Sequence, residues 1–544
     1  MNANDIENLY KLAADFWTWR ARYQPVSSDD IPRIDRPEDW DPNWSFESVE
    51  NQRKELAAFE ASLRALTTDK WAVTDQVDYR LIGSAMARVR WELDVLRSWE
   101  CNPRFYVYQS VGALFEILLK NKPFDEARSV EVIKSIERFT KFIEQGKANL
   151  SGNCVRPFAA ATLEILKDIG PQLTKVAFEL KPFLSSEFAK QVDAAMEKGI
   201  AALESFKVWL KDNLNSMSDQ SAIGRDSYVF FLREVALIPY TPEQLLSMGR
   251  QEWERSMAFE AFAKERAKSC AQLPIFPDEL TQIAAEEQEE KMIRQFMEDN
   301  NILSVPDWLQ HYINLPMPSY VEPLSGLGVV DDLTSMNRLD ENGFRYIPPP
   351  SRDLGYFELS SAQDPRPLIV HEGIPGHYYQ MSLAWAHENP IRRYYYDSGP
   401  NEGIGFYAEE MMLQCGLFDD SPRTREIIYN FMRLRALRVE VDIKLALGEF
   451  TIDQAADYLQ TRTPMDRGTA YAEAVFFSSL PGQAITYQIG KIQLIKLLAD
   501  ARQAQGEEFN LRKFHDYVWK NGNIPFSLLR WEYLGSTDEV ASLK

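Results

Sequence analysis

The chain has 544 residues, of which 45% are apolar and 26% are charged, and its formal net charge is −21 with a pI near 4.9. These values are typical of a soluble globular protein with a large core. Nucleic-acid binding requires a basic face, so a chain this acidic predicts no nucleic-acid partner. No apolar run approaches the roughly 18 residues of a membrane span, which predicts no membrane partner.

Apolar residues recur at three- and four-residue spacing along the N-terminal half, which predicts helices over 53–66, 75–96, 130–150 and 187–210. The segment Thr241-Pro242-Glu243-Gln244 has a capping-box spacing with proline at the first helical position, and predicts a helix that ends near Ala267. A proline-rich break follows at 273–278. We expect a helical N-terminal part, 1–270, and a second part, 271–544, as two domains or as one continuous two-lobed unit.

The segment His371-Glu372-Gly373-Ile374-Pro375-Gly376-His377 contains two of the five histidines of the chain. Two neutral imidazoles and one carboxylate are suitable ligands for Zn²⁺ and leave a fourth position for water. Glu372 directly follows the first histidine, where it can take a proton from that water. We therefore predict Zn²⁺ as the cofactor, with His371 and His377 as two of its ligands.

The spacing of these histidines differs from that of an ordinary zincin helix, in which they lie four residues apart on one face. Here they are six apart, and at about 100° per residue they lie on different faces of a regular helix. Pro375 lacks the N–H that would bond to the carbonyl of His371, and Gly376 adopts backbone angles that other residues resist. We expect a kink or bulge that turns both rings toward one metal.

The residues before and after this segment predict its setting. Residues 354–359 (Leu-Gly-Tyr-Phe-Glu-Leu) predict a short strand, and an edge strand beside such a site can pair with an extended peptide. Asp364-Pro365 resembles an N-cap followed by proline at the first helical position, and residues 378–385 continue an apolar helical run.

The third ligand is expected from Asn401-Glu402-Gly403, in which Glu402 lies 25 residues after His377. Glu402 and Glu409 are seven residues apart and share a helix face, but they lie about 10 Å apart along the axis, too far for both to bind one ion. We assign Glu402 to the metal. Glu409 is then a candidate to orient a histidine through its other ring nitrogen.

These motifs resemble a known family. His-Glu-x-x-Pro-Gly-His-x-x-Gln at 371–380 resembles the signature of a large group known as domain of unknown function 885, which is placed in the gluzincin-like metallopeptidase clan. Residues 402–409 resemble its second motif and the Asn-Glu-Gly-x-x-x-Tyr-x-Glu of aminopeptidases, in which the first Glu is the third zinc ligand. Pro-Gly-Gln-Ala-x-x-Tyr-x-x-Gly at 481–490 and the tail at 514–525 also match.

The resemblance spans most of the chain and is strongest over about 350–530. It implies a mainly α, large, bilobed zincin-like metallopeptidase fold with a small edge β-element near the active-site helix. The family usually has Trp-Ala where this chain has Ile404-Gly405, and a histidine expected shortly after Asp442 is replaced by Leu-Ala-Leu at 445–447. Both departures can reshape substrate specificity, and both leave the predicted ligands intact.

Four further residues are candidates for the site. Tyr487 can donate a hydrogen bond to the oxyanion of an attacked amide, or it is a core tyrosine. Arg435, with its neighbours on the same helix, can clamp a substrate carboxylate, although ion pairs with nearby glutamates explain it as well. Gln380 and Tyr407 are candidates to support the metal helix or to contact substrate. His311 and His515 are expected to be structural or surface residues.

The four cysteines (Cys101, Cys154, Cys270 and Cys415) lie far apart and form no zinc or redox motif. We expect free thiols in a reducing compartment. Residues 1–8 are polar and contain no apolar signal core. The sequence therefore predicts a cytoplasmic protein, with a removed export signal as the alternative.

Together, these features predict a zinc-dependent metallopeptidase that hydrolyses amide bonds of short peptides through a metal-activated water, with Glu372 as the general base. Carboxypeptidase, aminopeptidase and dipeptidase activities all stay open. The alternatives are a zinc amidohydrolase for a small non-peptide amide or ester, and a non-catalytic binding protein on a metallopeptidase scaffold. The sequence does not determine the oligomeric state.

Overall fold

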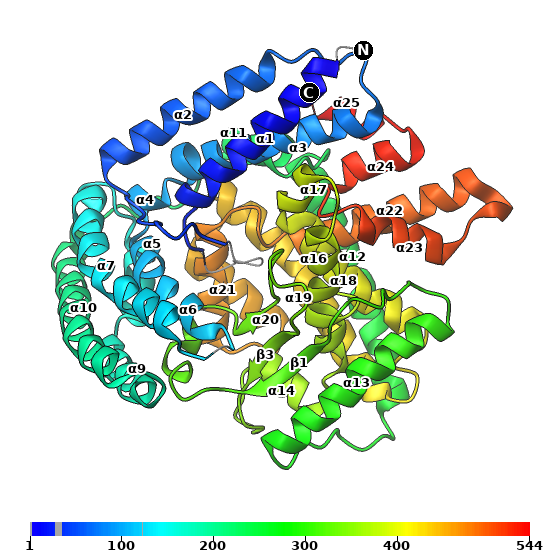
Figure 1. The fold of residues 1–544 in the computed structure, drawn as a ribbon. Helices are drawn as coiled ribbons and strands as arrows, with labels where there is room; N and C mark the ends of the chain where they lie inside the picture. Colours follow the sequence, from blue (N-terminus) through cyan, green and yellow to red (C-terminus); the bar gives the residue numbers. More distant parts are fainter. Residues whose placement is uncertain (1–2, 28–34, 122, 544) are drawn as a thin grey trace.

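Helices dominate the fold of the chain, which we describe from a computed structural model (Figure 1). The structure describes residues 3–27, 35–121 and 123–543. The first two residues of the polar segment 1–8 therefore lie outside the described residues, and no statement about the structure concerns them.

The N-terminal half confirms the helices expected from its apolar periodicity. The expected segment 75–96 forms a helix to Arg90 and then a π-helical turn over Trp91–Leu96. The capping box is present, because the Thr241 hydroxyl accepts from the Gln244 N–H and the Gln244 side chain accepts from the Thr241 N–H. The helices are α1 (Ala3–Tyr23), α2 (Phe46–Arg64), α3 (Val73–Arg90), α4 (Ser98–Cys101), α5 (Pro103–Val107), α6 (Ala113–Leu119), α7 (Glu126–Leu150), α8 (Arg156–Ile165), α9 (Ile169–Leu180), α10 (Ser186–Asn213), α11 (Arg225–Phe230) and α12 (Pro242–Ala267).

The C-terminal half is also helical and contains the small sheet. Its helices are α13 (Glu279–Asp299), α14 (Tyr356–Gln363), α15 (Arg366–Leu368), α16 (His377–Trp385), α17 (Pro390–Tyr394), α18 (Ser398–Gln414), α19 (Pro422–Leu447), α20 (Ile452–Arg462), α21 (Arg467–Ser479), α22 (Thr486–Gln505), α23 (Leu511–Lys520), α24 (Phe526–Leu534) and α25 (Asp538–Ser542). Its strands are β1 (Tyr312–Pro316), β2 (Asp331–Asp332) and β3 (Gly343–Ile347).

Within the described residues, the strands form one mixed sheet in the order β1-β3-β2. Strand β1 runs parallel to β3 and pairs Tyr312 with Gly343, whereas β2 runs antiparallel to β3. The sheet lies against the segment that carries the paired histidines, since the ring of Tyr378 packs on Gly343 and the ring of Tyr312 packs on Gly373. A small β-element therefore does lie beside this segment.

The strand predicted over 354–359 is wrong. Helix α14 begins at Tyr356, after Gly355 at its N-cap. The rings of Tyr356 and Phe357 both pack against Phe431 of α19. Consecutive residues of a strand point to opposite faces, so a strand would direct only one of these rings toward α19. Packing against α19 thus favours the helix over the strand that the local sequence suggests.

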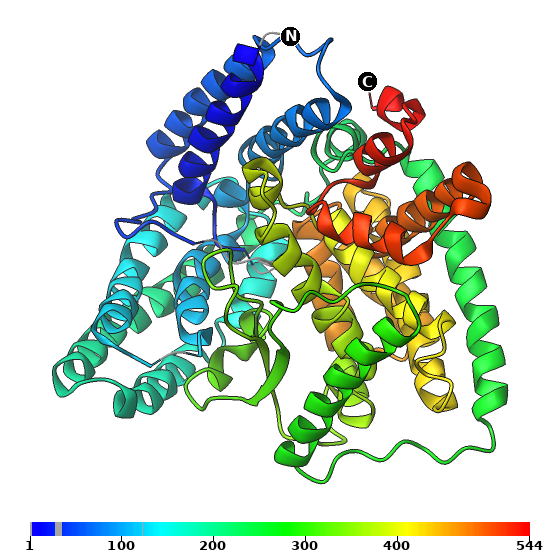
Figure 2. The ribbon, with the colours of Figure 1, turned by 45° about the vertical axis from the view of Figure 1, so that its right-hand side comes forward.

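The helices are arranged around the segment that contains the paired histidines. Helices α1, α2 and α4 to α10 form an arc on one side of the molecule, opposite α16 to α18, α22 and α23 (Figure 1). Helix α12 packs along α19, and the chain from its end runs below the molecule to α13 (Figure 2). The main apolar cluster includes residues from both halves, such as Leu81 and Phe526. The division at residue 270 stays a prediction.

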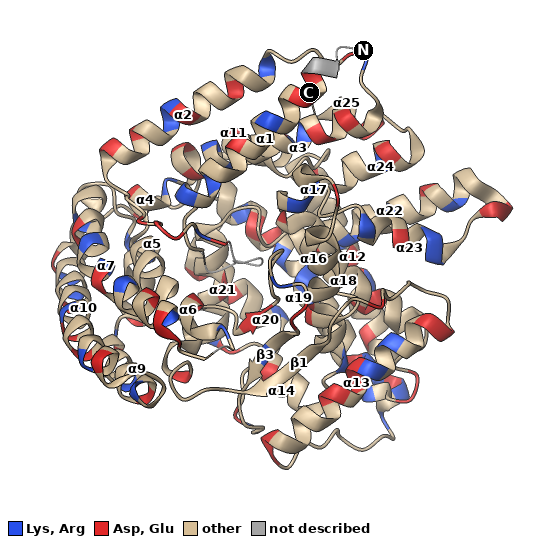
Figure 3. Ribbon diagram, in the orientation of Figure 1, with Lys and Arg blue, Asp and Glu red and all other residues tan. Residues whose placement is uncertain are grey.

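Charged residues of both signs are distributed over the outer helices. Lys and Arg are interspersed with Asp and Glu along α7, α9, α10 and α13 (Figure 3). In the described part of the chain, no helix is both long enough and apolar enough to cross a membrane.

Candidate metal centre

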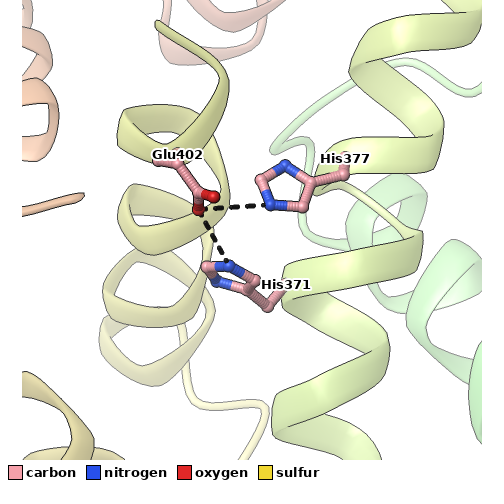
Figure 4. A group of neighbouring side chains, drawn as sticks. All are labelled: His371, His377 and Glu402. Carbon is pink, nitrogen blue, oxygen red and sulfur yellow. Dashed lines mark ion pairs between the residues drawn. The ribbon is translucent and has the colours of Figure 1, made fainter. Parts of the chain in front are cut away.

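Three buried side chains from separate parts of the chain meet at one point. His371, His377 and Glu402 each offer one ligand atom, and these atoms all lie within 4.8 Å of one another. One carboxylate oxygen of Glu402, Oε2, lies 3.4 Å from Nε2 of His371 and 3.3 Å from Nε2 of His377 (Figure 4). The three side chains form a group that can hold a metal ion.

The donor atoms of this group fit a tetrahedral ion. Zinc bonds of about 2.0–2.2 Å in tetrahedral geometry separate two ligand atoms by about 3.3 Å. The two N···O distances match that separation. Oε2 of Glu402 is buried and has no hydrogen-bond partner in the part of the chain that the structure describes. A buried oxygen in this position is costly unless a cation or a donor satisfies it.

The irregularity predicted between the histidines is present, although it interrupts the helix instead of bending it. Ile369–Gly373 forms a π-helical turn, Ile374–Gly376 is not helical, and α16 begins at His377. A Cβ atom on Gly376 would lie 1.8 Å from the carbonyl oxygen of His371, so no larger residue fits this backbone. The extra residue of the π turn and the break bring both imidazoles to one side.

Asp364 begins this segment much as the sequence suggests, with a shift of one residue. Its carboxylate accepts from the backbone N–H of Arg366, the first residue of α15, and Pro365 occupies the N-cap position. The same carboxylate pairs with the Arg366 guanidinium at 2.7 Å and accepts from the hydroxyl of Thr424 on α19 at 2.5 Å. Asp364 thus joins the metal segment to α19.

Helix α18 supplies Glu402, and glycines set its distance from its neighbours. A Cβ atom on Gly403 would lie 2.7 Å from the Cα of Gly490, so α18 and α22 touch through their backbones. A Cβ atom on Gly405 would lie 3.0 Å from the ring of His377 and 3.1 Å from the ring of His371. Gly405 therefore lies directly against both imidazoles.

Two charged residues stand behind His371. Its second ring nitrogen, Nδ1, lies 2.7 Å from Oε1 of Glu409, and the same oxygen lies 3.1 Å from the guanidinium of Arg435. All three side chains are buried. The structure thus brings Glu409 to the atom that the sequence assigned to it, and Arg435 forms an ion pair with Glu409.

The ligand candidates are strongly coupled by charge. Burial alone would lower the pKa of His371, but the carboxylates of Glu402 and Glu409 raise it to about 9. Burial alone would raise the pKa of Glu402, but the two histidines hold it well below its usual range. Metal ligands bind as neutral imidazoles and a carboxylate, so a divalent cation entering this group displaces protons.

Glu372 differs from its neighbours because its side chain is still 18% exposed, whereas that of His371 is 7% exposed. Its Oε1 lies 4.0 Å from a guanidinium nitrogen of Arg345 on β3. Arg345 in turn lies 3.2 Å from Asp331, which accepts from the hydroxyl of Tyr312 at 3.2 Å. The small sheet therefore presents a cation toward Glu372.

The ring of Tyr487 lies beside that of His371. The two rings are nearly parallel, at an angle of 15°, and their centroids are 6.3 Å apart. Two guanidinium groups face the tyrosine ring, Arg438 at 5.1 Å and Arg435 at 5.6 Å from its centroid. Arg438 is itself paired with Glu473 at 2.5 Å. Tyr487 is therefore beside the metal group, with two cations close to its ring.

The other candidates occupy the surroundings of the site. The Tyr407 hydroxyl lies 2.9 Å from Nε2 of His515, whose Nδ1 lies 2.8 Å from the carbonyl oxygen of Ile302. His515 is thus a buried, hydrogen-bonded structural residue. His311 lies 2.8 Å from the carboxylate of Glu290 and does not join the metal group.

The family assignment follows from the sequence as a whole. The family described as "Bacterial protein of unknown function (DUF885)" matches residues 33–532. The chain belongs to this family. The match confirms the family that the sequence resembles, whereas the signature motifs at 371–380 and 402–409 and the placement in the gluzincin-like clan stay predictions.

Two solved structures share the fold of this DUF885 chain. One is described as a putative lipoprotein of unknown function from Shewanella oneidensis, with 15% identity, a TM-score of 0.68 and 97% of each chain covered. The other is described as a putative lipoprotein from Colwellia psychrerythraea, with 17% identity, a TM-score of 0.73, and 97% of this chain and 98% of that chain covered. At these identities the similarity shows the fold alone. A comparison with curated proteins gave no match.

Asp442, a buried residue of this DUF885 chain, has a structural role that the sequence motifs did not indicate. The carboxylate of Asp442 accepts from the backbone N–H groups of Gly482 and Ala484 and from the hydroxyl of Tyr228. It thereby fixes the loop that leads into α22 and Tyr487. Burial raises the pKa of Asp442 to about 7. The only sequence signal was its place beside the missing family histidine.

Proposed function

We propose that this protein is a zinc-dependent peptidase that hydrolyses amide bonds of short peptides. One observation carries the proposal: a buried group of two histidines and a glutamate adjoins a glutamate that still reaches solvent. A purely structural metal site has four protein ligands and needs no such carboxylate, whereas a hydrolytic site keeps one position open. His371, His377 and Glu402 are the residues that would hold the ion.

Zinc would supply Lewis acidity, which polarises a substrate carbonyl and makes a water molecule more acidic. Glu372 accepts the proton of the attacking water on its carboxylate and later gives it to the leaving amine nitrogen. Arg345, 4.0 Å away, faces that carboxylate and orients it. Oε1 of Glu409 lies 2.7 Å from Nδ1 of His371 and orients the ring, which leaves Nε2 available as a ligand.

Tyr487 is the proposed hydrogen-bond donor to the developing oxyanion. Its ring lies parallel to that of His371, and its hydroxyl belongs to a side chain that is only partly buried. The guanidinium groups of Arg435 and Arg438 near the ring add positive potential where negative charge develops. A donor aimed at the transition state lowers the barrier more than it aids substrate binding.

A cavity of about 200 Å³ at the starts of α18 and α22 favours a short substrate. Its lining includes Ser398 and Thr486, the first residues of these helices. Ser398 is four residues before Glu402, so both lie on the same face of α18, about 6 Å apart along the axis. Space of this size, about one helical turn from Glu402, suits one or two residues of a peptide.

The test is a substrate screen with metal control. Protein supplied with one equivalent of zinc should cleave members of a dipeptide and tripeptide library, and excess chelator should abolish cleavage. Cleavage of small non-peptide amides with no peptide cleaved would replace the proposal by the amidohydrolase alternative. Zinc binding without any hydrolysis would leave the binding-protein alternative.

The cellular location stays a prediction. Both solved relatives are described as putative lipoproteins, which supports export as the alternative to the cytoplasm. Immunoblotting of fractionated cells that express the full natural gene would distinguish the two.

A further inference from the structure

A second cavity, of about 280 Å³, is lined by residues of the small sheet, α13 and α14, and by Leu368, four residues before Glu372. We propose that this cavity binds the positively charged side chain of a lysine or arginine next to the bond that is cleaved. The inference rests on the proposed peptidase function and names the class of peptide that this site would select.

The cavity is close enough to Glu372 to hold the side chain of a neighbouring substrate residue. Arg345 lines the cavity and also lies 4.0 Å from Oε1 of Glu372. Leu368 lines it as well, four residues before Glu372 and in the same helical segment. Residues at this spacing lie on neighbouring turns of one face, so one wall of the cavity lies about one helical turn from Glu372.

The walls of the cavity are suited to an amphipathic side chain. Much of the lining is apolar, from Met317, Val330, Ile347, Leu354, Phe357 and Leu368. Lysine and arginine have long hydrocarbon stems that pack on apolar surface while the charged group reaches a polar region. A short polar side chain would leave these walls uncovered.

The polar end of the cavity offers an acceptor without a donor. Gln282 of α13 lines the cavity and is only 3% exposed. Its Nε2 donates to Oε1 of Glu286 at 2.9 Å, but its own Oε1 has no hydrogen-bond partner among residues 3–27, 35–121 and 123–543. A buried acceptor without a hydrogen bond destabilises the fold, and a donor that binds to it removes this penalty. An ammonium or guanidinium group supplies such donors.

The charges around the cavity favour a cation. Glu286 is buried beneath Gln282, and burial raises its pKa to about 7, although Gln282 and Arg345 partly oppose this rise. Glu358 lines the cavity. The one cation of the lining, Arg345, is already held by Asp331 at 3.2 Å and faces Glu372. Because Arg345 is already paired with Asp331, the lining carboxylate of Glu358 and the partly ionised Glu286 favour a second positive charge.

The first experiment compares lysine with norleucine, which has a stem of similar length and no charge. Tripeptides with lysine, arginine, norleucine or glutamate at each position are supplied to the zinc-loaded protein. We expect kcat/KM to be at least about tenfold higher for lysine and arginine than for norleucine at one position. Equal rates, or a preference for glutamate that would assign Arg345 as the receptor of a substrate carboxylate, overturn the inference.

Two variants of α13 connect the preference to the cavity. Glu286→Gln should reduce the lysine-to-norleucine ratio of kcat/KM to near one. Glu287→Gln makes the same change at an exposed neighbour paired with Lys291, and it should keep the wild-type ratio. If Glu286→Gln does not fold, Gln282→Leu and Glu358→Gln replace it. If all these variants keep the wild-type lysine-to-norleucine ratio, another part of the protein causes the preference, and the inference is overturned.

A binding measurement separates this inference from the proposed function. Calorimetry with end-capped alanine tetrapeptides that contain one lysine or one norleucine requires no hydrolysis. Wild-type protein should bind the lysine peptide at least about tenfold more tightly, and Glu286→Gln should not discriminate. Discrimination without hydrolysis of any peptide would reject the peptidase and keep the cation site. Hydrolysis of peptides without tighter binding of the lysine peptide would keep the peptidase and reject the cation site.

Discussion

Gln380 and Asn401 connect the two helices that carry the metal ligands. Nδ2 of Asn401 donates to Oε1 of Gln380 at 2.8 Å, and both side chains are fully buried. Gln380 lies three residues after His377 on α16, and Asn401 directly precedes Glu402 on α18. A single buried hydrogen bond therefore fixes the distance between one histidine ligand and the carboxylate ligand.

Replacing this hydrogen bond should weaken metal binding. Gln380→Leu leaves Asn401 without its acceptor and lets α16 and α18 shift, so we expect zinc affinity to fall by about 10–100-fold, as for other residues that orient ligands. A chelator competition titration measures the affinity. Gln109→Leu removes another buried glutamine, hydrogen-bonded to Val26 and remote in sequence, and should leave zinc affinity unchanged. Equal affinity in both variants would show that the bond does not position the ligands.

Removing the carboxylate ligand should abolish metal binding. Near one zinc per chain is expected for the wild type by plasma mass spectrometry, and close to none for Glu402→Ala, because two histidines alone hold the ion weakly. Glu410→Ala on the same helix is the control, since Glu410 is also buried and pairs with Lys491 at 2.7 Å. Zinc retained in Glu402→Ala would move the third ligand to Glu409 or to another residue.

Features that depend on local chemistry were predictable from the sequence. Thr241 and Gln244, which form the capping box, are only three residues apart, so a segment of four residues predicts the start of α12. His371, His377 and Glu402 are recognisable because few side chains bind zinc, and histidine is rare in this chain. Even the break before His377 follows from Pro375 and Gly376.

Features that depend on packing between distant segments were not predictable. Residues 354–359 are apolar enough for a strand, and only the contact of Tyr356 with Phe431 on α19 decides for a helix. Gly403 and Gly490 each look like a weak position in a helix until α18 and α22 are seen to touch there. The acceptor of Gln282 on α13 becomes a site only when the sheet and α14 close the cavity.

Glu372→Gln should separate metal binding from catalysis. Glutamine is similar in size and cannot take a proton from water, so zinc content should stay near one per chain while hydrolysis falls by about 10²–10⁴-fold. Mass spectrometry of the bound metal and a peptide cleavage assay on the same sample provide both readouts. Full hydrolysis by a zinc-loaded variant would exclude Glu372 as the general base.

Tyr487→Phe should lower kcat with little change in KM. Loss of a single oxyanion donor typically reduces kcat by about 10²–10³-fold, because the interaction forms only as charge develops. Tyr407→Phe is the matched control, since its hydroxyl contacts His515 and not the metal group. That variant should keep kcat and lose about 1 kcal/mol of stability, the usual contribution of one hydrogen bond. Equal loss of kcat in both would indicate a general structural effect.

His515 should make the fold sensitive to acid. Burial lowers its pKa to about 4, whereas the unfolded chain titrates near 6.5. Between these values the unfolded state binds more protons than the folded state, so the free energy of unfolding decreases as the pH falls. His515 lowers the free energy of unfolding by about 1.4 kcal/mol for each pH unit from 6.5 down to about 4. Below pH 4 the loss does not grow further, because the histidine is protonated in both states.

His515→Gln, which does not titrate, should therefore flatten the pH dependence between pH 6.5 and 4. Urea midpoints with chelator present in every sample measure it, because acid would otherwise also strip metal from His371 and His377 and obscure the effect. His311→Gln, which removes a histidine whose side chain is 45% exposed, is measured beside it as the second histidine variant. A slope that His515→Gln leaves unchanged would mean that other groups account for the acid sensitivity.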